Sequence, residues 1–121
     1  MNNEFQDYPA IRRAVQHYID GGRTGSSQTM RPGFHENASI HGHLGPGLIS
    51  GPIQILYDWV DANPPASDLA DCIACMDVRG SFATVRVELD NWAGHRFTDV
   101  LSLLKVDGEW KIVCKTFHLH G

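Results

Sequence analysis

Two dipeptides, Gly80-Ser81 and Asp107-Gly108, constrain the fold of this chain more than any other feature of its sequence. Each stands between two stretches in which apolar and polar residues alternate. A glycine-containing dipeptide in that setting is typical of a two-residue β-hairpin turn. The C-terminal half is therefore predicted to be an antiparallel meander of four strands, near residues 68–79, 82–92, 95–106 and 109–119.

The N-terminal half has mainly helical periodicity, because its apolar residues recur at intervals of three and four. Helices that precede a run of strands predict an α+β fold, with the helices on one face of the sheet. The expected elements are a helix from Asp7 to Gly21-Gly22, a short helix that begins at Ser26 or Ser27 and ends at Pro32-Gly33, strands at 37–44 and 48–50, and a helix between Ser50-Gly51-Pro52 and Asn63-Pro64-Pro65.

Composition fits a globular domain. The chain has 121 residues, of which 42% are hydrophobic and 20% charged, so residues 1–121 are expected to form one domain with a single core. A net charge of −4 argues against a nucleic-acid or anionic-membrane partner. No apolar run is long enough for a membrane span, and the polar N-terminus has no signal-peptide pattern. A cytoplasmic protein is expected.

The cysteines do not suggest a disulfide framework, because their number is odd. Reduced thiols in a cytoplasm are the simpler expectation. Cys72 and Cys75 lie in a predicted strand, where a spacing of three places two side chains on opposite faces. We therefore expect buried or half-buried thiols and not a redox or zinc site.

The Asp107-Gly108 turn predicts which residues of the last hairpin share a face. If Val106 lies opposite Glu109, one face is largely apolar and should pack on the helices. Asp99 and His118 fall on that face, where an unpaired charge is costly. The same face is expected to carry Phe97, Leu101, Leu103, Trp110, Ile112, Cys114 and Thr116, and the outer face Lys111, Lys115 and Phe117. The Gly80-Ser81 turn likewise places Ala74, Met76, Val78, Ala83, Val85, Val87 and Leu89 together.

Histidines occur in two His-x-His pairs, at His41 and His43 and at His118 and His120. Each spacing places two imidazoles on one face of a strand. In the strand at 37–44 the apolar residues are Ala38, Ile40 and Gly42, which directs His41 and His43 to the outer face or the rim. The further ligands of a metal site are not found at suitable spacing, so we expect no metal and no cofactor.

The order of the elements, together with one C-terminal run, resembles the nuclear transport factor 2-like (NTF2-like) superfamily. The run is Trp92-x-Gly94-x-Arg96-Phe97-x-Asp99-x-Leu101-x-Leu103-Leu104-Lys105-x-Asp107-Gly108-x-Trp110-Lys111-Ile112. Within the superfamily the chain is most similar to small SnoaL-like or putative lumazine-binding-type proteins. The resemblance implies a cone-shaped, cystatin-like α+β fold, in which three N-terminal helices pack on a curved, mixed, mostly antiparallel six-stranded sheet with a pocket at its wide mouth.

The superfamily includes ketosteroid isomerases, scytalone dehydratase, polyketide cyclases and non-catalytic proteins, so the fold alone does not choose a chemistry. Tyr18 matches the isomerase tyrosine that donates to the substrate oxyanion, and Trp59 matches a tyrosine of the pocket wall. Gly42 stands where the isomerases have their general base, and Leu101 approximately where they have a second oxyanion acid. Steroid isomerisation is therefore not expected. Asp99 is more similar to the strand acid that aldol-type polyketide cyclases use as a base.

These observations predict a protein that binds a small, largely apolar molecule, with general acid–base chemistry of the cyclase, isomerase or dehydratase type as its enzymatic form. Asp99 would be the base, His118 its partner and Tyr18 the donor to a developing oxyanion. The expected ligand contacts are Tyr18, Phe34, Ile40, Trp59, Met76, Leu101 and Thr116.

Two alternatives stay open. The protein would be either a non-catalytic ligand-binding module or a dimeric interaction module. Both would be consistent with an Asp99 that only bonds to a helix terminus, an arginine or a tyrosine, and with a Tyr18 that is only a core residue bonded to a strand. In either case a homodimer through the outer sheet face is expected, because Val113, Phe117 and Leu119 are predicted to be exposed there.

Overall fold

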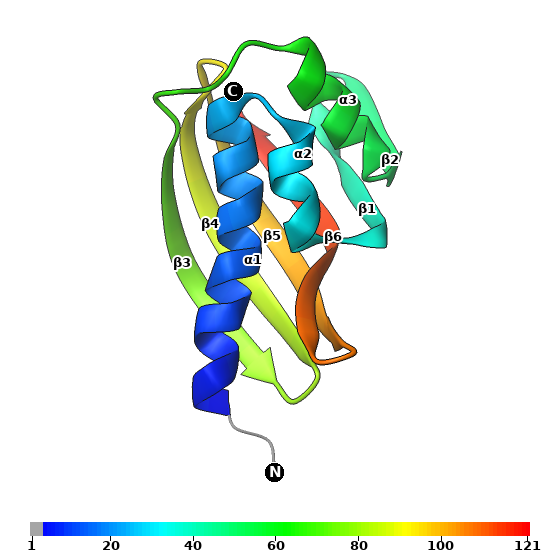
Figure 1. The fold of residues 1–121 in the computed structure, drawn as a ribbon. Helices are drawn as coiled ribbons and strands as arrows, with labels where there is room; N and C mark the ends of the chain where they lie inside the picture. Colours follow the sequence, from blue (N-terminus) through cyan, green and yellow to red (C-terminus); the bar gives the residue numbers. More distant parts are fainter. Residues whose placement is uncertain (1–3) are drawn as a thin grey trace.

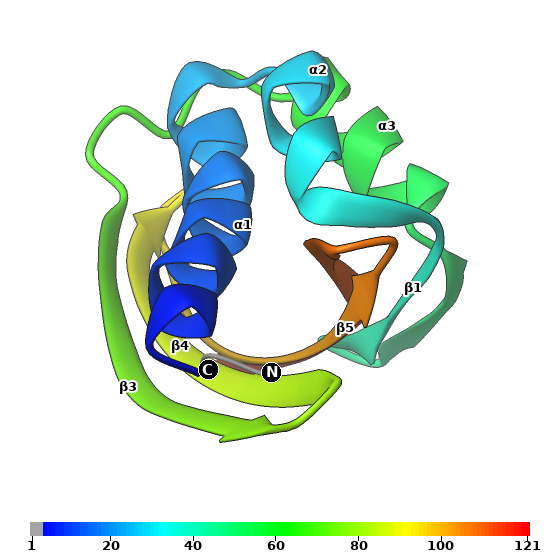
Figure 2. The same ribbon diagram turned by 60° about the horizontal axis from the view of Figure 1, so that its bottom comes forward.

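The computed structural model describes residues 4–121 and contains a six-stranded sheet with the strand order β2-β1-β6-β5-β4-β3. β1 pairs with β6 in parallel, and the four other neighbouring pairs are antiparallel. The sheet is curved (Figures 1 and 2). Its strands are β1 (Phe34–Leu44), β2 (Gly47–Pro52), β3 (Ala70–Arg79), β4 (Phe82–Trp92), β5 (His95–Val106) and β6 (Glu109–His120).

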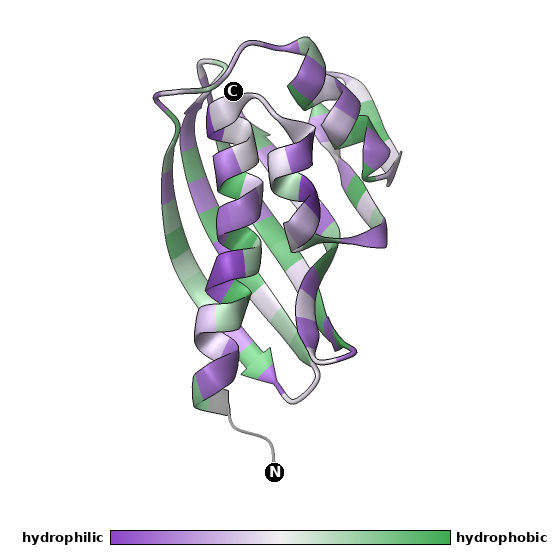
Figure 3. Cartoon of the chain, viewed as in Figure 1, coloured by the Kyte–Doolittle hydropathy of each residue, from purple (hydrophilic) through white to green (hydrophobic). Residues whose placement is uncertain are grey.

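The helices lie on the concave face of this sheet (Figure 2). They are α1 (Glu4–Thr24), α2 (Ser27–Met30), the 3₁₀ helix η1 (Arg31–Gly33) and α3 (Gln54–Ala62). Among the described residues, no helix is long and apolar enough to cross a membrane. Apolar and polar residues alternate along the strands (Figure 3), and the apolar phase meets the helices in one core.

The two hairpin predictions are confirmed. Arg79 lies opposite Phe82, and Val106 lies opposite Glu109, so each turn consists of the predicted dipeptide. The last four strands begin and end within two residues of the predicted positions. The turn signals were therefore sufficient to define the meander.

The predicted end of the first helix is wrong, because α1 continues through Gly21 and Gly22. The helix ends at Gly25, whose φ is +68°, and the Ser26 N–H donates to the Gly21 carbonyl at 3.0 Å. Gly21 instead permits close packing, because a Cβ there would lie 2.5 Å from the Cβ of Met30. A Cβ at Gly22 would likewise lie 2.8 Å from the Trp92 ring of β4, so the glycine pair reflects close packing and not helix termination.

A β-bulge interrupts the last hairpin, which the sequence analysis treated as regular. Leu103 lies opposite Ile112, but the next residue pair is Ser102 opposite Cys114. β6 therefore contains one extra residue, Val113, at this point. Because side chains alternate with a period of two, one inserted residue exchanges the faces of everything that follows it.

The predictions that placed Cys114, Thr116 and His118 on the concave face are therefore wrong. Thr116 and His118 are exposed and Cys114 is half-buried, and all three lie on the outer face beyond the bulge. The prediction that Lys115 and Phe117 point outward is wrong for the same reason. Both side chains are buried on the concave face, with 6% and 8% of their surface exposed.

A second bulge adds Ala74 to β3 and has a similar consequence. Cys72 lies opposite Glu88 and Cys75 opposite Arg86, and these two β4 residues share the outer face. Both thiols are free and exposed. Three predictions are therefore wrong: that the two thiols lie on opposite faces, that they are buried or half-buried, and that Ala74 points inward. The extra residue places both cysteines on the same face of the strand.

Candidate functional site

A cavity of about 90 Å³ lies between α1, α3 and the sheet. Its walls are almost entirely apolar. Two of the lining side chains, Tyr18 and Lys115, bring a hydroxyl and an amine. The lining residues are Tyr18, Ile40, Leu44, Ile49, Ile55, Leu56, Trp59, Trp92, Phe97, Lys115 and Phe117.

Asp99 forms a buried polar cluster with Tyr18 and Lys115 at this wall. Asp99 is fully buried and accepts a short hydrogen bond from the Tyr18 hydroxyl through Oδ2. The Lys115 Nζ lies 3.9 Å from the same oxygen. Oδ1 of Asp99 is buried and has no hydrogen-bond partner among the described residues. A buried carboxyl that is only half satisfied is costly.

Three different elements position these side chains. Tyr18 belongs to the buried stripe of α1 that faces the sheet. Asp99 follows the inward phase of β5, between Phe97 and Leu101. Lys115 points inward because the bulge at Val113 shifts the phase of β6. The cluster therefore depends on tertiary packing and on one local irregularity.

Burial dominates the electrostatics of the cluster. It raises the pKa of Asp99 above its usual value, against the opposing effects of the Lys115 charge and the Tyr18 hydrogen bond. Burial lowers the pKa of Lys115, although the charge of Asp99 acts in the opposite direction. Burial and the charge of Asp99 together raise the pKa of Tyr18. Asp99 and Lys115 are thus both displaced toward their neutral forms, which suits a pair that exchanges protons.

The amine of Lys115 has unusual surroundings for a lysine. Nζ lies 4.7 Å from the ring centroid of Phe117 and 5.5 Å from that of Tyr18. Aromatic faces stabilise a cation and partly replace lost water. Among the described residues, no acceptor lies within hydrogen-bond distance of Nζ, and Asp99 is its one ion-pair partner. The amine is therefore not held by a strong, short contact.

Several predicted site residues do meet in this region. Tyr18, Ile40 and Trp59 line the cavity. Asp99 does not line the cavity, but it contacts Tyr18 and Lys115, which do. The direct bond between Tyr18 and Asp99 joins two residues that are 81 positions apart in the chain.

Other predicted site residues lie elsewhere. Phe34 and Leu101 are buried in the core, where the Phe34 ring packs edge-on against Tyr18. Met76 is half-buried on β3 and packs against the core. Thr116 and His118 are exposed on the outer face, so the predicted partnership of His118 with Asp99 has no geometric basis.

The sequence analysis missed Lys115, which it placed on the outer face. One signal was available. Large apolar residues occupy even positions early in the strand, at Trp110 and Ile112, and odd positions later, at Phe117 and Leu119. Such a change of phase within one strand is what a bulge produces.

Gly42 has a packing role. It lies opposite Phe117 on the neighbouring strand, and a Cβ at Gly42 would lie 2.6 Å from the Phe117 ring. The aromatic ring fills the space that a larger side chain at this position would need. An acidic side chain like that of the ketosteroid isomerases does not fit here without displacing Phe117.

The four histidines of the two His-x-His pairs lie on the outer face and the rim of the sheet. Nδ1 of His41 is 2.8 Å from the Ser50 hydroxyl, and the rings of His118 and His120 are 4.7 Å apart. In residues 4–121, no group of three or more His, Cys, Asp or Glu side chains is arranged to hold a metal ion.

Comparison with known proteins gives a family and a fold. The family model described as putative lumazine-binding matches residues 6–118. Among curated proteins, the chain is similar to an aldolase, FrzH, from Cladobotryum sp. The two are 29% identical over 113 residues, which cover 93% of this chain and 90% of that protein.

Solved structures agree on the architecture. An NTF2-like protein of unknown function from Shewanella baltica OS155 is 37% identical, with a TM-score of 0.93, and the match covers 100% of this chain and 99% of that one. A second NTF2-like protein of unknown function, from Methylobacillus flagellatus KT, is 39% identical with a TM-score of 0.93, over 96% and 94% of the two chains. The predicted NTF2-like, cystatin-like α+β fold is confirmed.

Proposed function

The chain belongs to the putative lumazine-binding family of NTF2-like proteins, and we propose that it is an enzyme that binds a small, largely apolar carbonyl compound. Its chemistry would be proton transfer next to the carbonyl group. This step is common to isomerases, dehydratases and enzymes that form or break carbon–carbon bonds. One observation carries the proposal: the Tyr18–Asp99–Lys115 cluster lies at the wall of an otherwise apolar cavity.

The cavity supports a ligand with one polar end. Most of its lining is aliphatic or aromatic, including Trp59 and Phe117. Ligand pockets with few polar groups orient their ligand through those groups. A carbonyl oxygen would therefore point toward Tyr18 and Lys115, and the hydrocarbon part toward α3 and β2.

The cluster can stabilise the negative charge that develops on the oxygen when a neighbouring carbon loses a proton. A protonated Asp99 can donate to the Tyr18 oxygen, which leaves the Tyr18 hydrogen free for the ligand. Asp99 does not line the cavity, so we assign it the role of holding a proton for Tyr18. Two of the described groups that line the cavity can accept a proton from the ligand: the neutral amine of Lys115, and the Tyr18 oxygen when an ionised Asp99 takes the Tyr18 hydrogen.

The aldolase among the relatives supports carbon–carbon bond chemistry as the reaction type. An aldol reaction begins with the same loss of a proton next to a carbonyl group. The fold alone would not favour this chemistry over the others.

Exchange of hydrogen for deuterium tests the proposal without knowledge of the natural substrate. Apolar ketones that raise the Tm of the protein are incubated with it in D₂O, and proton NMR follows loss of the hydrogens next to the carbonyl. We expect exchange above the rate in buffer, and a lower rate in Tyr18→Phe. Tyr57→Phe is the matched control, because Tyr57 is a buried tyrosine of α3 that does not line the cavity. Ketones that bind without faster exchange would favour the non-catalytic binding module.

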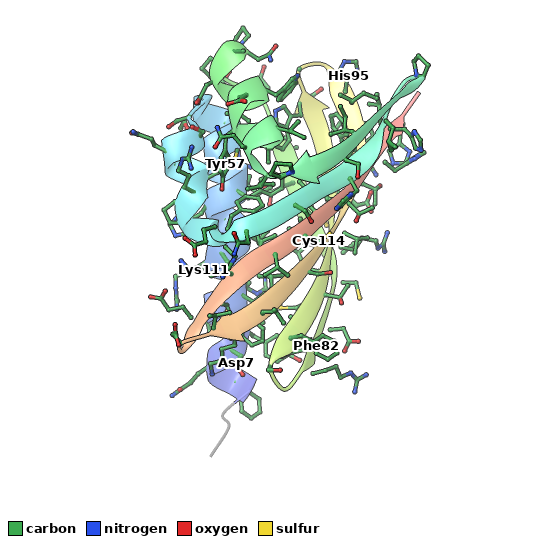
Figure 4. All side chains as sticks on the ribbon, turned by 90° about the vertical axis from the view of Figure 1, so that its right-hand side faces the viewer. Asp7, Tyr57, Phe82, His95, Lys111 and Cys114 are labelled. Atoms are coloured by element: carbon green, nitrogen blue, oxygen red, sulfur yellow. The ribbon has the colours of Figure 1, made fainter. Side chains whose placement is uncertain are left out.

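We also propose that the outer sheet face joins two copies of the chain. Contrary to the prediction, Phe117 and Leu119 do not contribute, because both follow the inward phase of β6 after the bulge. The outer face instead exposes Phe82, Val100 and Leu104, with 48%, 38% and 41% of their surface accessible. These residues share the outer face of β4 and β5, where Phe82 lies opposite Leu104. Phe82 is labelled in Figure 4, near the turn between β3 and β4.

A further inference from the structure

We infer that Lys115 is a nucleophile whose amine forms a covalent imine with an apolar ketone or aldehyde in the cavity. The inference rests on the proposed function and specifies its route. It replaces the proton-accepting role of the lysine by a covalent one.

Position distinguishes Lys115 from the two other lysines of the chain. Lys105 donates to Asp7 at 3.0 Å and keeps 34% of its side chain exposed. Lys111 donates to the Pro32 carbonyl at 2.8 Å. The Lys115 side chain is 7% exposed and lines the cavity. Of the three amines, it is the one that a ligand in the cavity meets.

The surroundings of Lys115 favour the reactive form of the amine. Tyr18 of α1 and Asp99 of β5 are the titratable groups that face it. β1 and α3 contribute apolar cavity walls there, including Ile40 and Trp59. Burial lowers the pKa of Lys115, and only the neutral amine has the lone pair that attacks a carbonyl carbon.

The reaction balances without any further reactant. The lone pair of Nζ forms a bond to the carbonyl carbon, and the π electrons of the C=O bond move to oxygen. The C–O bond then breaks, and the oxygen leaves as water with the two hydrogens of the amine. The product is one imine and one water molecule for each amine and carbonyl consumed. The Tyr18–Asp99 pair lies beside Nζ and can pass the protons that this exchange requires.

An imine would also make the proposed proton transfer easier. The imine nitrogen first takes up a proton from the Tyr18–Asp99 pair. A neighbouring carbon then gives a proton back to that pair through the Tyr18 oxygen, and the electron pair released moves to the nitrogen, which gives a neutral enamine. A neutral product suits an apolar cavity better than an enolate, because burying a charge is costly. The substrate class is therefore apolar ketones and aldehydes small enough for the cavity.

Reductive trapping tests the inference. The protein is incubated with cyclopentanone and sodium cyanoborohydride, and intact mass and peptide mapping locate the product. A trapped imine adds the mass of the probe less one oxygen atom. We expect Lys115 to be labelled faster than Lys105 and Lys111, about tenfold for each unit by which its pKa is lowered. Dihydroxyacetone, a polar carbonyl compound, should show no preference for Lys115.

Variants supply the controls. Lys115→Arg keeps the charge but has no neutral amine, so it should abolish the fast label, whereas Lys111→Arg should preserve it. Lys115→Met repeats the test with an apolar side chain if the arginine does not fit, and circular dichroism verifies folding. Asp99→Asn removes the charge that raises the pKa of Lys115 and also a proton carrier, so the pH midpoint of labelling should fall and the maximal rate of labelling should fall with it.

The outcomes separate the inference from the proposed function. Labelling confined to Lys105, Lys111 and the N-terminal amine would overturn the inference. If cyclopentanone still raises the Tm and exchanges its hydrogens in D₂O, the proposed function survives with a non-covalent lysine. If the ketone neither binds nor exchanges nor labels Lys115, both are overturned.

Discussion

Two buried aspartates of this protein have nearly the same set of partners and different chemistry. Asp7, near the lower end of α1 in Figure 4, accepts hydrogen bonds from Trp110 and Lys105, each at 3.0 Å. Asp99 accepts one from Tyr18 and has its lysine at 3.9 Å. Each aspartate has an aromatic donor, a lysine and one carboxyl oxygen without a hydrogen-bond partner among the described residues.

The difference lies in how the lysine is placed. Lys105 bonds directly to its carboxylate and reaches solvent, and the hydrogen bonds from Trp110 and Lys105 lower the pKa of Asp7. Lys115 is buried and does not reach bonding distance, and burial raises the pKa of Asp99. The first arrangement ties α1 to the β5–β6 hairpin. The second shifts an acid and an amine toward their neutral forms beside a cavity, which favours proton transfer.

The largest difference between the two regions should appear in catalysis. Lys115→Met should reduce ketone hydrogen exchange by on the order of 10²–10⁴, the usual contribution of a positioned acid or base. Lys105→Met, which alters the other pair, should leave the exchange rate unchanged. NMR in D₂O measures both. Equal losses in the two variants would show that the pairs are not functionally distinct.

Ligand affinity should depend on the cavity wall near the second pair. Trp59→Ala removes apolar contact, and the loss of ~55 Å² at ~25 cal/mol per Å² corresponds to about tenfold in Kd. Leu48→Ala, an exposed position that does not line the cavity, should have no effect. Titration calorimetry with a ketone found by thermal shift measures this. An unchanged Kd in Trp59→Ala would place the ligand elsewhere.

The pH dependence of stability should have opposite signs at the two aspartates. The pKa of Asp99 is raised, so its contribution is present below about 3.8, the usual value, and is lost as the pH rises through the folded-state pKa. The pKa of Asp7 is lowered, so its contribution is present above 3.8 and is lost as the pH falls. Destabilisation by Asp99→Asn should therefore shrink as the pH rises from about 4, and that by Asp7→Asn should shrink as the pH falls.

Urea unfolding of the two variants and the parent chain, from acid to neutral pH, measures these differences. The same slope for both variants would mean that the two carboxyls have similar environments. Such a result would remove the basis for treating the cluster at Asp99 as special.

The smallest effect concerns assembly and should be independent of both pairs. Val100→Asp on the outer face should shift sedimentation at micromolar concentration from dimer to monomer, with little change in ketone exchange. Leu48→Asp, on β2 and away from the β4–β5 patch, is the control. A parent chain that sediments as a monomer at every concentration would contradict the proposed dimer.

Sequence reasoning was accurate where local chemistry decides the structure. A turn dipeptide needs only its own backbone preferences, so Asp107-Gly108 correctly predicted the last hairpin and the inward position of Asp99. Helical periodicity correctly placed Tyr18 on the buried face of α1. Tyr18 and Asp99 are two of the three residues that form the candidate site.

It failed where a β-bulge or a helix–helix contact decides. The extra residue Val113 carries no turn signal of its own. It nevertheless turns His118 to the outer face and Lys115 to the concave face. A glycine is typical of a helix end, but Gly21 lies within α1, where it leaves room for the Met30 side chain. Neither a turn dipeptide nor helical periodicity predicts such features, and the bulge shows in the sequence only as the change of apolar phase between Ile112 and Phe117.

The most direct test of the contrast between the two aspartates is a carbon-13 NMR titration of their carboxyl groups, assigned with Asp7→Asn and Asp99→Asn. The structure predicts that Asp99 titrates above 3.8 and Asp7 below it. In the Lys115→Met variant, which lacks the lysine charge, the titration midpoint of Asp99 should rise further, because the Lys115 charge lowers the pKa of Asp99. If Asp99 instead titrates at or below the midpoint of Asp7, the cluster is an ordinary structural ion pair and the proposed acid–base site is contradicted.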